Sequence, residues 1–115
     1  MPVIKKSQVE LSPLSADDVI GVSKANIIGE SEGWYSHTMR LFNVQPGGHT
    51  PRHAHPWEHV NYITQGHGHL RMGGDVLDLD VGDFAFVPPN TEHQFENSSD
   101  DTFQFICIVP NTAAF

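Results

Sequence analysis

GGHTPRHAHPWEHVNYITQG, residues 47–66, is the stretch that decides the fold, because it carries His53, His55 and His59 at odd positions only. Successive side chains of a β-strand point to opposite faces, so this parity predicts that the three imidazoles share one face of a strand. Three neutral nitrogen donors on one face suit a transition metal held inside a β-barrel or β-sandwich.

The segments on both sides of this stretch are short, apolar-rich and separated by Gly, Pro and Asn, with almost nothing at helical spacing. This pattern predicts an all-β domain. We expect no more than a helical turn near residues 14–18, and a turn at residues 46–48 that leads into the histidines. The expected strands are residues 3–11 at the periphery, 19–28, 35–44, 60–64, 69–72 and 76–79 as a hairpin, 84–87, 93–96 and 102–109.

Size and charge limit the class of protein. A chain of 115 residues predicts one domain, residues 1–115, and its net charge of −8, with six Lys and Arg, provides no basic surface for nucleic acid or an anionic membrane. No apolar run is long enough to span a bilayer. Residues 1–13 lack the apolar run of a signal peptide, and the single cysteine, Cys107, cannot form an internal disulfide, so we expect a cytoplasmic protein.

A second pattern follows fifteen residues after the first, and both have regular spacing. The first is Gly47-x5-His53-x-His55-x3-His59-x6-Gly66, and the second, over residues 82–97, is Gly82-x5-Pro88-x-Asn90-x2-His93-x3-Asn97. Together they resemble the two motifs of the cupin superfamily. The resemblance implies a double-stranded β-helix, a small jelly-roll-like cupin barrel, with a divalent metal held by His53, His55, His59 and His93.

Two positions depart from the usual cupin motifs. Asn90 replaces a glycine, which is acceptable because Asn tolerates a left-handed conformation. His59 replaces a glutamate, and the runs HAHPWEH and GDFAFVPPNTEH resemble the tetra-histidine, manganese-type subgroup of small single-domain cupins of the cupin-2 type. A β-bulge at Pro56 would instead place Glu58 at the ligand position, and this alternative stays open from the sequence.

The resemblance also implies which side chains form the wall of the metal cavity. The last strand would present one face to the metal, and Phe95 lies two residues beyond His93. No carboxylate pair or Ser-His-Asp arrangement is visible, so catalytic residues beyond the metal ligands stay unknown. The candidates for the wall are Arg40, Phe95, Phe105, Cys107 and Val109.

Four imidazoles leave two neighbouring coordination positions of an octahedral metal for small ligands. Together with an apolar wall, this predicts a metal-dependent, dioxygenase-like oxygenase that acts on a small, largely apolar molecule. Mn²⁺ is the expected metal, and Fe²⁺, Cu²⁺, Ni²⁺ or Zn²⁺ also suit an all-nitrogen site. The alternative is a non-catalytic, metal-anchored cupin that binds or senses a small molecule. A sugar-phosphate isomerase or epimerase has little support because Lys and Arg are few. A homodimer through residues 3–11 and the last strand is also expected.

Overall fold

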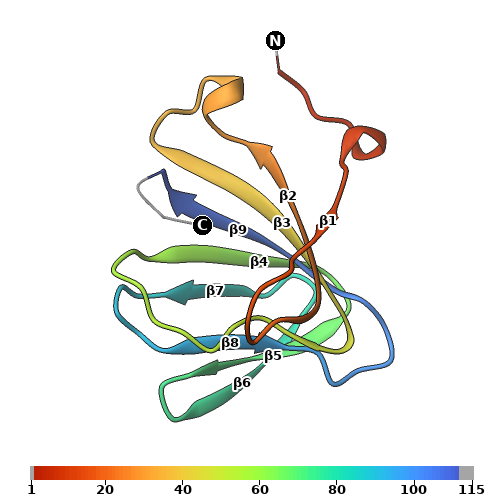
Figure 1. The fold of residues 1–115 in the computed structure, drawn as a ribbon, viewed down its shortest axis with the longest axis vertical. Coiled ribbons are helices and arrows are strands. Elements are labelled where there is room, and N and C mark those ends of the chain that lie inside the picture. Colours follow the sequence, from red (N-terminus) through yellow and green to blue (C-terminus); the bar gives the residue numbers. More distant parts are fainter. Residues whose placement is uncertain (1, 112–115) are drawn as a thin grey trace.

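Nine strands and two short 3-10 turns make up the computed structural model, which describes residues 2–111. The strands follow one another with short connections, apart from the segments around the 3-10 turns and the histidine-rich segment before β4 (Figure 1). The elements are η1 (Lys6–Gln8), β1 (Ser12–Pro13), β2 (Ile20–Ile28), η2 (Glu30–Glu32), β3 (His37–His49), β4 (His59–Gln65), β5 (His67–Met72), β6 (Asp75–Asp80), β7 (Phe84–Val87), β8 (His93–Glu96) and β9 (Phe103–Pro110).

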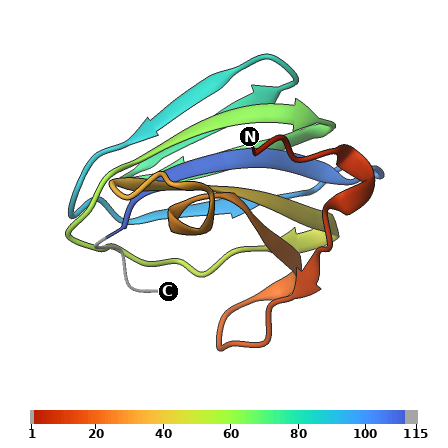
Figure 2. The same ribbon diagram turned by 90° about the horizontal axis from the view of Figure 1, so that it is seen from above.

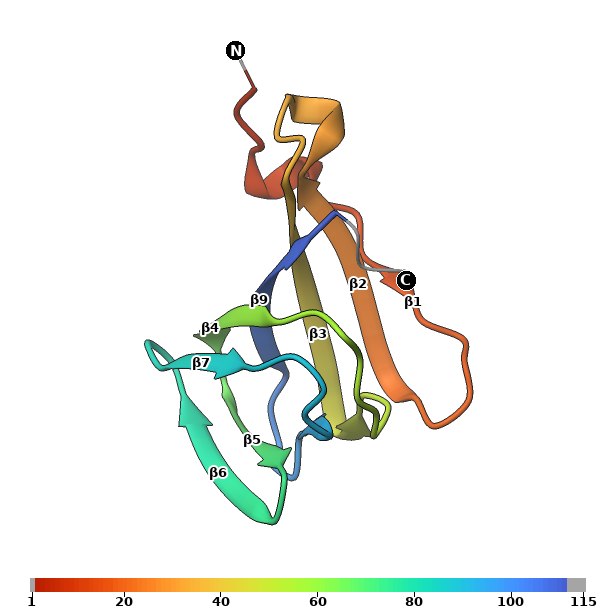
Figure 3. The same ribbon diagram turned by 90° about the vertical axis from the view of Figure 1, so that its left-hand side faces the viewer.

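The strands form a curved sheet in the order β6-β5-β8-β3-β9-β4-β7, in which β2 also pairs with β3, and β1 with β2 (Figures 2 and 3). β3 joins the two halves because its first part pairs with β9 and its end pairs with β8 through His49 and Glu96. The all-β barrel expected from the sequence is confirmed.

The interior of the barrel is filled by alternate residues of the central strands. In β9 every second side chain is buried, and β4 follows the same alternation from its first residue onward. Period-two alternation of this kind places one face of each strand in the core. The buried apolar cluster consists of Val22, Phe42, Val44, Ile63, Leu70, Leu79, Val87, Phe95, Phe103, Phe105, Cys107 and Val109.

Most of the strand predictions coincide with observed strands, but that for residues 3–11 is wrong. This segment contains the turn η1, in which no side chain is buried, and the Gln8 side chain accepts a hydrogen bond from the backbone N–H of Lys5 at 2.8 Å. Because the segment buries no apolar face against the sheet, nothing stabilises an extended strand there.

The turn predicted at residues 46–48 is also wrong, since β3 continues through it to His49. Gly47 adopts a φ of 80°, which bends the strand without ending it. Its N–H donates to the carbonyl of Asn97 at 2.8 Å, and the Asn97 N–H donates to the carbonyl of Gly48 at 3.0 Å. The start of the first motif is thereby joined to the end of the second.

None of the helical segments in residues 2–111 has the length and apolar character needed to cross a membrane.

Candidate metal centre

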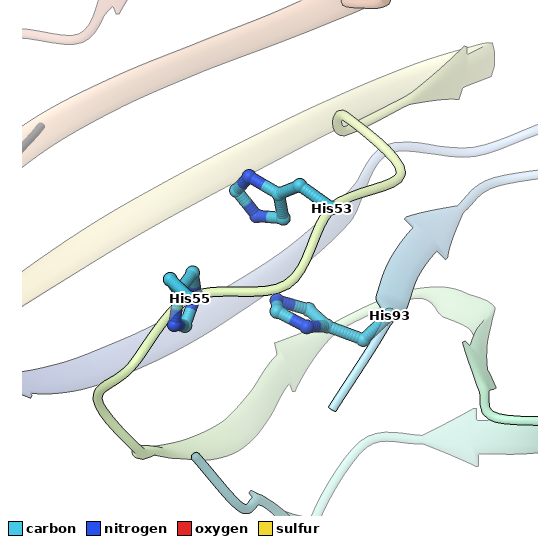
Figure 4. A group of neighbouring side chains, drawn as sticks. All are labelled: His53, His55 and His93. Atoms are coloured by element: carbon cyan, nitrogen blue, oxygen red, sulfur yellow. The ribbon is translucent and has the colours of Figure 1, made fainter. Parts of the chain in front are cut away.

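The four predicted ligands come from a loop and from the first residues of two strands. His53 and His55 lie on residues 50–58, between β3 and β4, and His93 begins β8 (Figure 4). His59 is the first residue of β4. The expectation that three histidines share one strand face is therefore wrong. Pro51 and Pro56 flank the first two histidines and cannot donate to a strand ladder, so this segment is irregular apart from one bridge between His53 and His93.

Backbone hydrogen bonds hold this loop along β8. The N–H of His53 donates to the carbonyl of His93 at 3.2 Å, and the N–H of His93 donates back at 2.9 Å. The N–H of Asn90 donates to the carbonyl of His55 at 2.7 Å, and Asn90 has the left-handed φ, 60°, that the sequence allows at this position. The two motifs thus run side by side, which brings their histidines together.

His93 is the centre of the cluster. Its ring centroid lies 4.9 Å from the centroids of His53, His55 and His59 alike. Ligand nitrogens of His53, His55 and His93 all lie within 4.8 Å of one another. The Nε2 atom of His59 lies 3.1 Å from the Nε2 atom of His93, so the structure brings all four histidines into one group.

Hydrogen bonds fix the tautomers of three of these rings. Nδ1 of His55 lies 2.8 Å from the carbonyl of Trp57, and Nδ1 of His93 lies 2.9 Å from the carbonyl of Thr91. Nδ1 of His59 lies 2.6 Å from Oδ1 of Asn61. A carbonyl oxygen only accepts, so each Nδ1 carries the proton and each Nε2 presents a lone pair. This is the arrangement that metal-binding histidines adopt.

This arrangement fits a divalent transition metal. Two Nε2 lone pairs face each other across 3.1 Å between His59 and His93, and they repel unless a cation lies between them. Two nitrogens each about 2.1 Å from a metal and at right angles to it are about 3 Å apart, close to the observed separation. An all-imidazole donor set favours first-row transition metals over Mg²⁺ or Ca²⁺.

Burial keeps the four imidazoles uncharged. It lowers the pKa of His59 to about 3 and of His53 to about 4, with the neighbouring histidines adding to the shift. The pKa values of His55 and His93 are also lowered, chiefly by burial. All four rings are therefore neutral at pH 7, and protons do not compete there with a metal for the ring nitrogens.

The histidines line a cavity of about 250 Å³. Four of the five predicted wall residues line it: Arg40, Phe95, Phe105 and Cys107. Val109 is buried in the core instead, paired with Thr38, because it lies two residues, about 7 Å, further along β9 than Cys107.

Arg40 is held against the cavity wall. It is 3% exposed, its Nη2 donates to Sγ of Cys107 at 3.1 Å, and its guanidinium lies over the ring of Phe42 at 5.1 Å. Burial raises the pKa of the Cys107 thiol, so this cysteine is protonated at neutral pH. A protonated, buried thiol is neither a nucleophile nor a metal ligand.

The sequence interpretation missed several lining residues, of which Lys24 is the most informative. Lys24 follows the buried Val22 by two residues in β2, so both share the inward face. A lysine two residues after an apolar valine in a predicted strand, and so on the same strand face, is the signal that could have identified it. The other missed residues are Leu14, Ser15, Ala16, Val19, Phe42, Thr50 and Pro51.

The structure excludes the alternative in which Glu58 replaces His59. Glu58 is absent from the described cavity lining, whereas His59 is 4% exposed and faces His93. No bulge at Pro56 shifts the register, because β4 begins at His59 and pairs directly with Val87 of β7.

Comparison with known proteins gives one family and several relatives. The family described as Cupin domain matches residues 40–109. The 1-methylthio-D-xylulose 5-phosphate methylsulfurylase of Rhodospirillum rubrum is 34% identical over 71 residues, 62% of this chain and 46% of the relative. An uncharacterised protein of Methanocaldococcus jannaschii is 29% identical over 65 residues, 56% of this chain and 52% of the relative. The chain thus spans about half the length of these curated relatives.

Solved structures share the fold at lower identity. The polyketide cyclase RemF of Streptomyces resistomycificus superposes with a TM-score of 0.89 at 24% identity, covering 96% of this chain and 79% of that one. A predicted oxalate decarboxylase of Thermotoga maritima has a TM-score of 0.85 at 20% identity, covering 95% of this chain and 98% of that one. At these identities the similarity shows the fold alone.

Proposed function

Because the chain belongs to the cupin domain family, and because imidazole lone pairs converge in its cavity, we propose that it is a metal-dependent oxygenase acting on a small, largely apolar molecule. The observation that supports the metal in this proposal most directly is the pair of facing Nε2 atoms of His59 and His93, 3.1 Å apart. Under this proposal all four histidines, His53, His55, His59 and His93, hold one divalent metal. Manganese is the proposed ion, and a cytoplasmic location stays a prediction from the sequence.

Each part of the cavity has a role in this proposal. A divalent metal bound by the histidines supplies Lewis acidity and, for manganese or iron, electron exchange with dioxygen. The carbonyl oxygens of Asn61, Trp57 and Thr91 orient the rings by accepting hydrogen bonds from their Nδ1–H groups. Phe95 and Phe105 provide an apolar wall that excludes water from the reacting molecule.

A second candidate function is metal-anchored binding or sensing without turnover. The described lining contains no carboxylate, and its one thiol, Cys107, is protonated. Apart from the histidines and Lys24, the described lining therefore has no evident group to accept a proton from a substrate. This observation favours a binding protein over an enzyme that depends on acid–base catalysis.

Oxygen uptake by the metal-loaded protein tests the proposed function. Protein purified from its native host should contain about one metal ion per chain, measured by mass spectrometry, and should consume oxygen with at least one member of a panel of diketones, phenolics, thiols and alkenes. Chelated protein serves as the control. Stoichiometric metal with no uptake across the panel, and a steep fall in melting temperature on chelation, would favour the binding protein.

Replacing Asn61 with leucine should weaken metal binding by about 10–100-fold, the usual effect of removing the partner that orients a metal-binding histidine. Asn61 is fully buried, and its Oδ1 accepts a hydrogen bond from Nδ1–H of His59. Competition with a chromophoric chelator measures the affinity. Asn26→Leu, at an exposed position of β2 that is not among the described lining residues, is the control and should bind metal as the unmodified protein does. Unchanged affinity in Asn61→Leu would remove His59 from the proposed ligand set.

We also propose a homodimer, but through a surface different from the one the sequence indicated. β9 is paired on both sides, with β3 and β4, so it has no open edge to offer. The outward faces of β4 and β7 instead expose Val60, Tyr62, Phe84 and Phe86 at 42, 36, 75 and 55%. Tyr62 and Phe84 already contact each other at 4.7 Å between ring centroids. A contiguous apolar face of this kind suits a self-complementary two-fold contact.

Phe84→Glu should convert this dimer to a monomer. Two copies of a glutamate brought together at a two-fold contact lose solvation and repel each other. Sedimentation velocity at micromolar concentration measures the change, and Val76→Glu, a similarly exposed apolar position on β6, is the matched control. A monomer in the unmodified protein, or a dimer that persists in Phe84→Glu, would contradict the proposal.

A further inference from the structure

Two cationic side chains, Lys24 and Arg40, line the same cavity as the four histidines. They come from the neighbouring strands β2 and β3, which lie side by side in Figure 3. Lys24 pairs with Phe42, whose side chain is buried, and Arg40 lies two residues before Phe42 on the same inward face. Both cations are therefore fixed by strand register on the cavity side of the barrel.

The charge of the cavity is opposite to that of the whole chain. The chain has a net charge of −8, yet no Asp or Glu is among the described residues that line the cavity. Since the histidines are neutral, Lys24 and Arg40 give the cavity a positive charge even before a metal binds. In a site with low-dielectric walls, such a charge attracts anions more strongly than it would at an open surface.

The rest of the wall is aromatic. Phe105 stacks on Phe42 with ring centroids 5.4 Å apart and on Phe95 with centroids 4.4 Å apart, and all three rings line the cavity. The cavity volume of about 250 Å³ is slightly below the range of about 300–1,000 Å³ found for pockets that hold drug-sized ligands. The space therefore suits a small molecule with a flat or apolar body.

We propose that this cavity binds a small organic anion, with Lys24 and Arg40 holding a carboxylate or enolate and the phenylalanine rings contacting its apolar body. The inference rests on the proposed function and sharpens it, since the substrate becomes an amphipathic anion. The bond from Arg40 to Cys107 and the contact with Phe42 hold the guanidinium in position. Little side-chain entropy is then lost when an anion binds. Burial beside Arg40 lowers the pKa of Lys24, which a bound anion would reverse.

Benzoate and benzamide are suitable probes, because they have nearly the same shape and differ in charge. The experiment uses the metal-free protein and measures both dissociation constants by titration calorimetry. Charged hydrogen bonds should make benzoate bind at least about tenfold more tightly than benzamide. Inorganic phosphate, the third probe, should bind more weakly than benzoate because it lacks an apolar body.

Lys24→Met tests the role of the lysine, since methionine keeps an unbranched apolar side chain and removes the charge. The preference for benzoate should fall to about twofold, while Lys5→Met, at an exposed position, should keep it. Lys24→Gln repeats the test if the methionine variant fails to fold by circular dichroism. The inference would be overturned by equal affinity for benzoate and benzamide, or by a dissociation constant for benzoate above about 10 mM. It would also be overturned if loss of Lys24 left the preference unchanged, or if phosphate bound more tightly than benzoate.

These outcomes are separable from those of the oxygenase proposal. Benzoate selectivity is measured without metal, so it holds or fails whatever the oxygen-uptake experiment shows. If the protein prefers benzoate but consumes no oxygen, the anion site is supported and the oxygenase proposal is contradicted. If the protein consumes oxygen but does not prefer benzoate to benzamide, only the anion-site proposal is contradicted.

Discussion

Replacing His93 with alanine should reduce bound metal from about one ion per chain to nearly none, with a loss of affinity of at least about a hundredfold. His93 is the residue whose ring lies 4.9 Å from each of the other three, so its removal opens the centre of the cluster. Changes to residues that merely orient a ligand cost about 10–100-fold, and loss of a ligand itself should cost no less. Metal content by mass spectrometry and affinity by chelator competition measure the effect.

The control for this prediction is His67→Ala. His67 is an exposed histidine on β5 that contacts Asp80 at 2.7 Å. The His67→Ala substitution should leave the metal content unchanged. The loss of metal in His93→Ala would then be specific to His93 and not a result of replacing a histidine at an arbitrary position. Normal metal stoichiometry in a folded His93→Ala protein would contradict the assignment of His93 as a ligand.

Gly66→Ala should destabilise the fold by about 3 kcal/mol or more, which lowers the melting temperature by about 10 °C in a domain of this size. Gly66 has a φ of 76°, and a Cβ there would lie 2.1 Å from the carbonyl oxygen of Thr102. The obstructing atom belongs to the backbone just before β9, so it cannot move aside without disturbing that strand. Thermal unfolding followed by circular dichroism measures the shift.

Two neighbouring glycines separate the causes of this effect. Gly73 has a φ of 60° with nothing near its Cβ position, so Gly73→Ala should show only the conformational cost, about 1 kcal/mol. Gly74 has neither a left-handed φ nor a near atom, and Gly74→Ala should be close to neutral. If Gly66→Ala lowers the melting temperature no more than Gly73→Ala does, then close approach to Thr102 does not explain the glycine at the end of the first motif.

The fold was largely predictable because most strands alternate apolar and polar residues between clear turn signals. β9 is the best example, with every second residue buried. The prediction failed where tertiary pairing overrides local signals. Pro46 and Gly47 read as a turn, but hydrogen bonds to Asn97, fifty residues later in the chain, keep β3 paired through that point. Single-sequence patterns carry no information on such long-range partners.

The four predicted histidines lie close together, but the strand geometry expected for the first three was wrong. Motif spacing identified His53, His55, His59 and His93, which the structure brings into one group, but the strand parity used to group the first three does not apply to a loop flanked by prolines. Lys24 was missed because β2 lies outside both motifs. Its position opposite Phe42 is set by strand pairing, which only the folded sheet defines.

The hydrogen-bonded pairing of the two motifs also determines when the candidate metal site forms during folding. His53 and His93 are forty residues apart in the chain and meet only when the loop is laid along β8. Non-local pairings of this kind form late, because the entropy cost of closing the loop comes before the contact can stabilise the chain. We therefore expect the metal to load into an already folded barrel, so that its supply affects occupancy rather than the rate at which the chain folds.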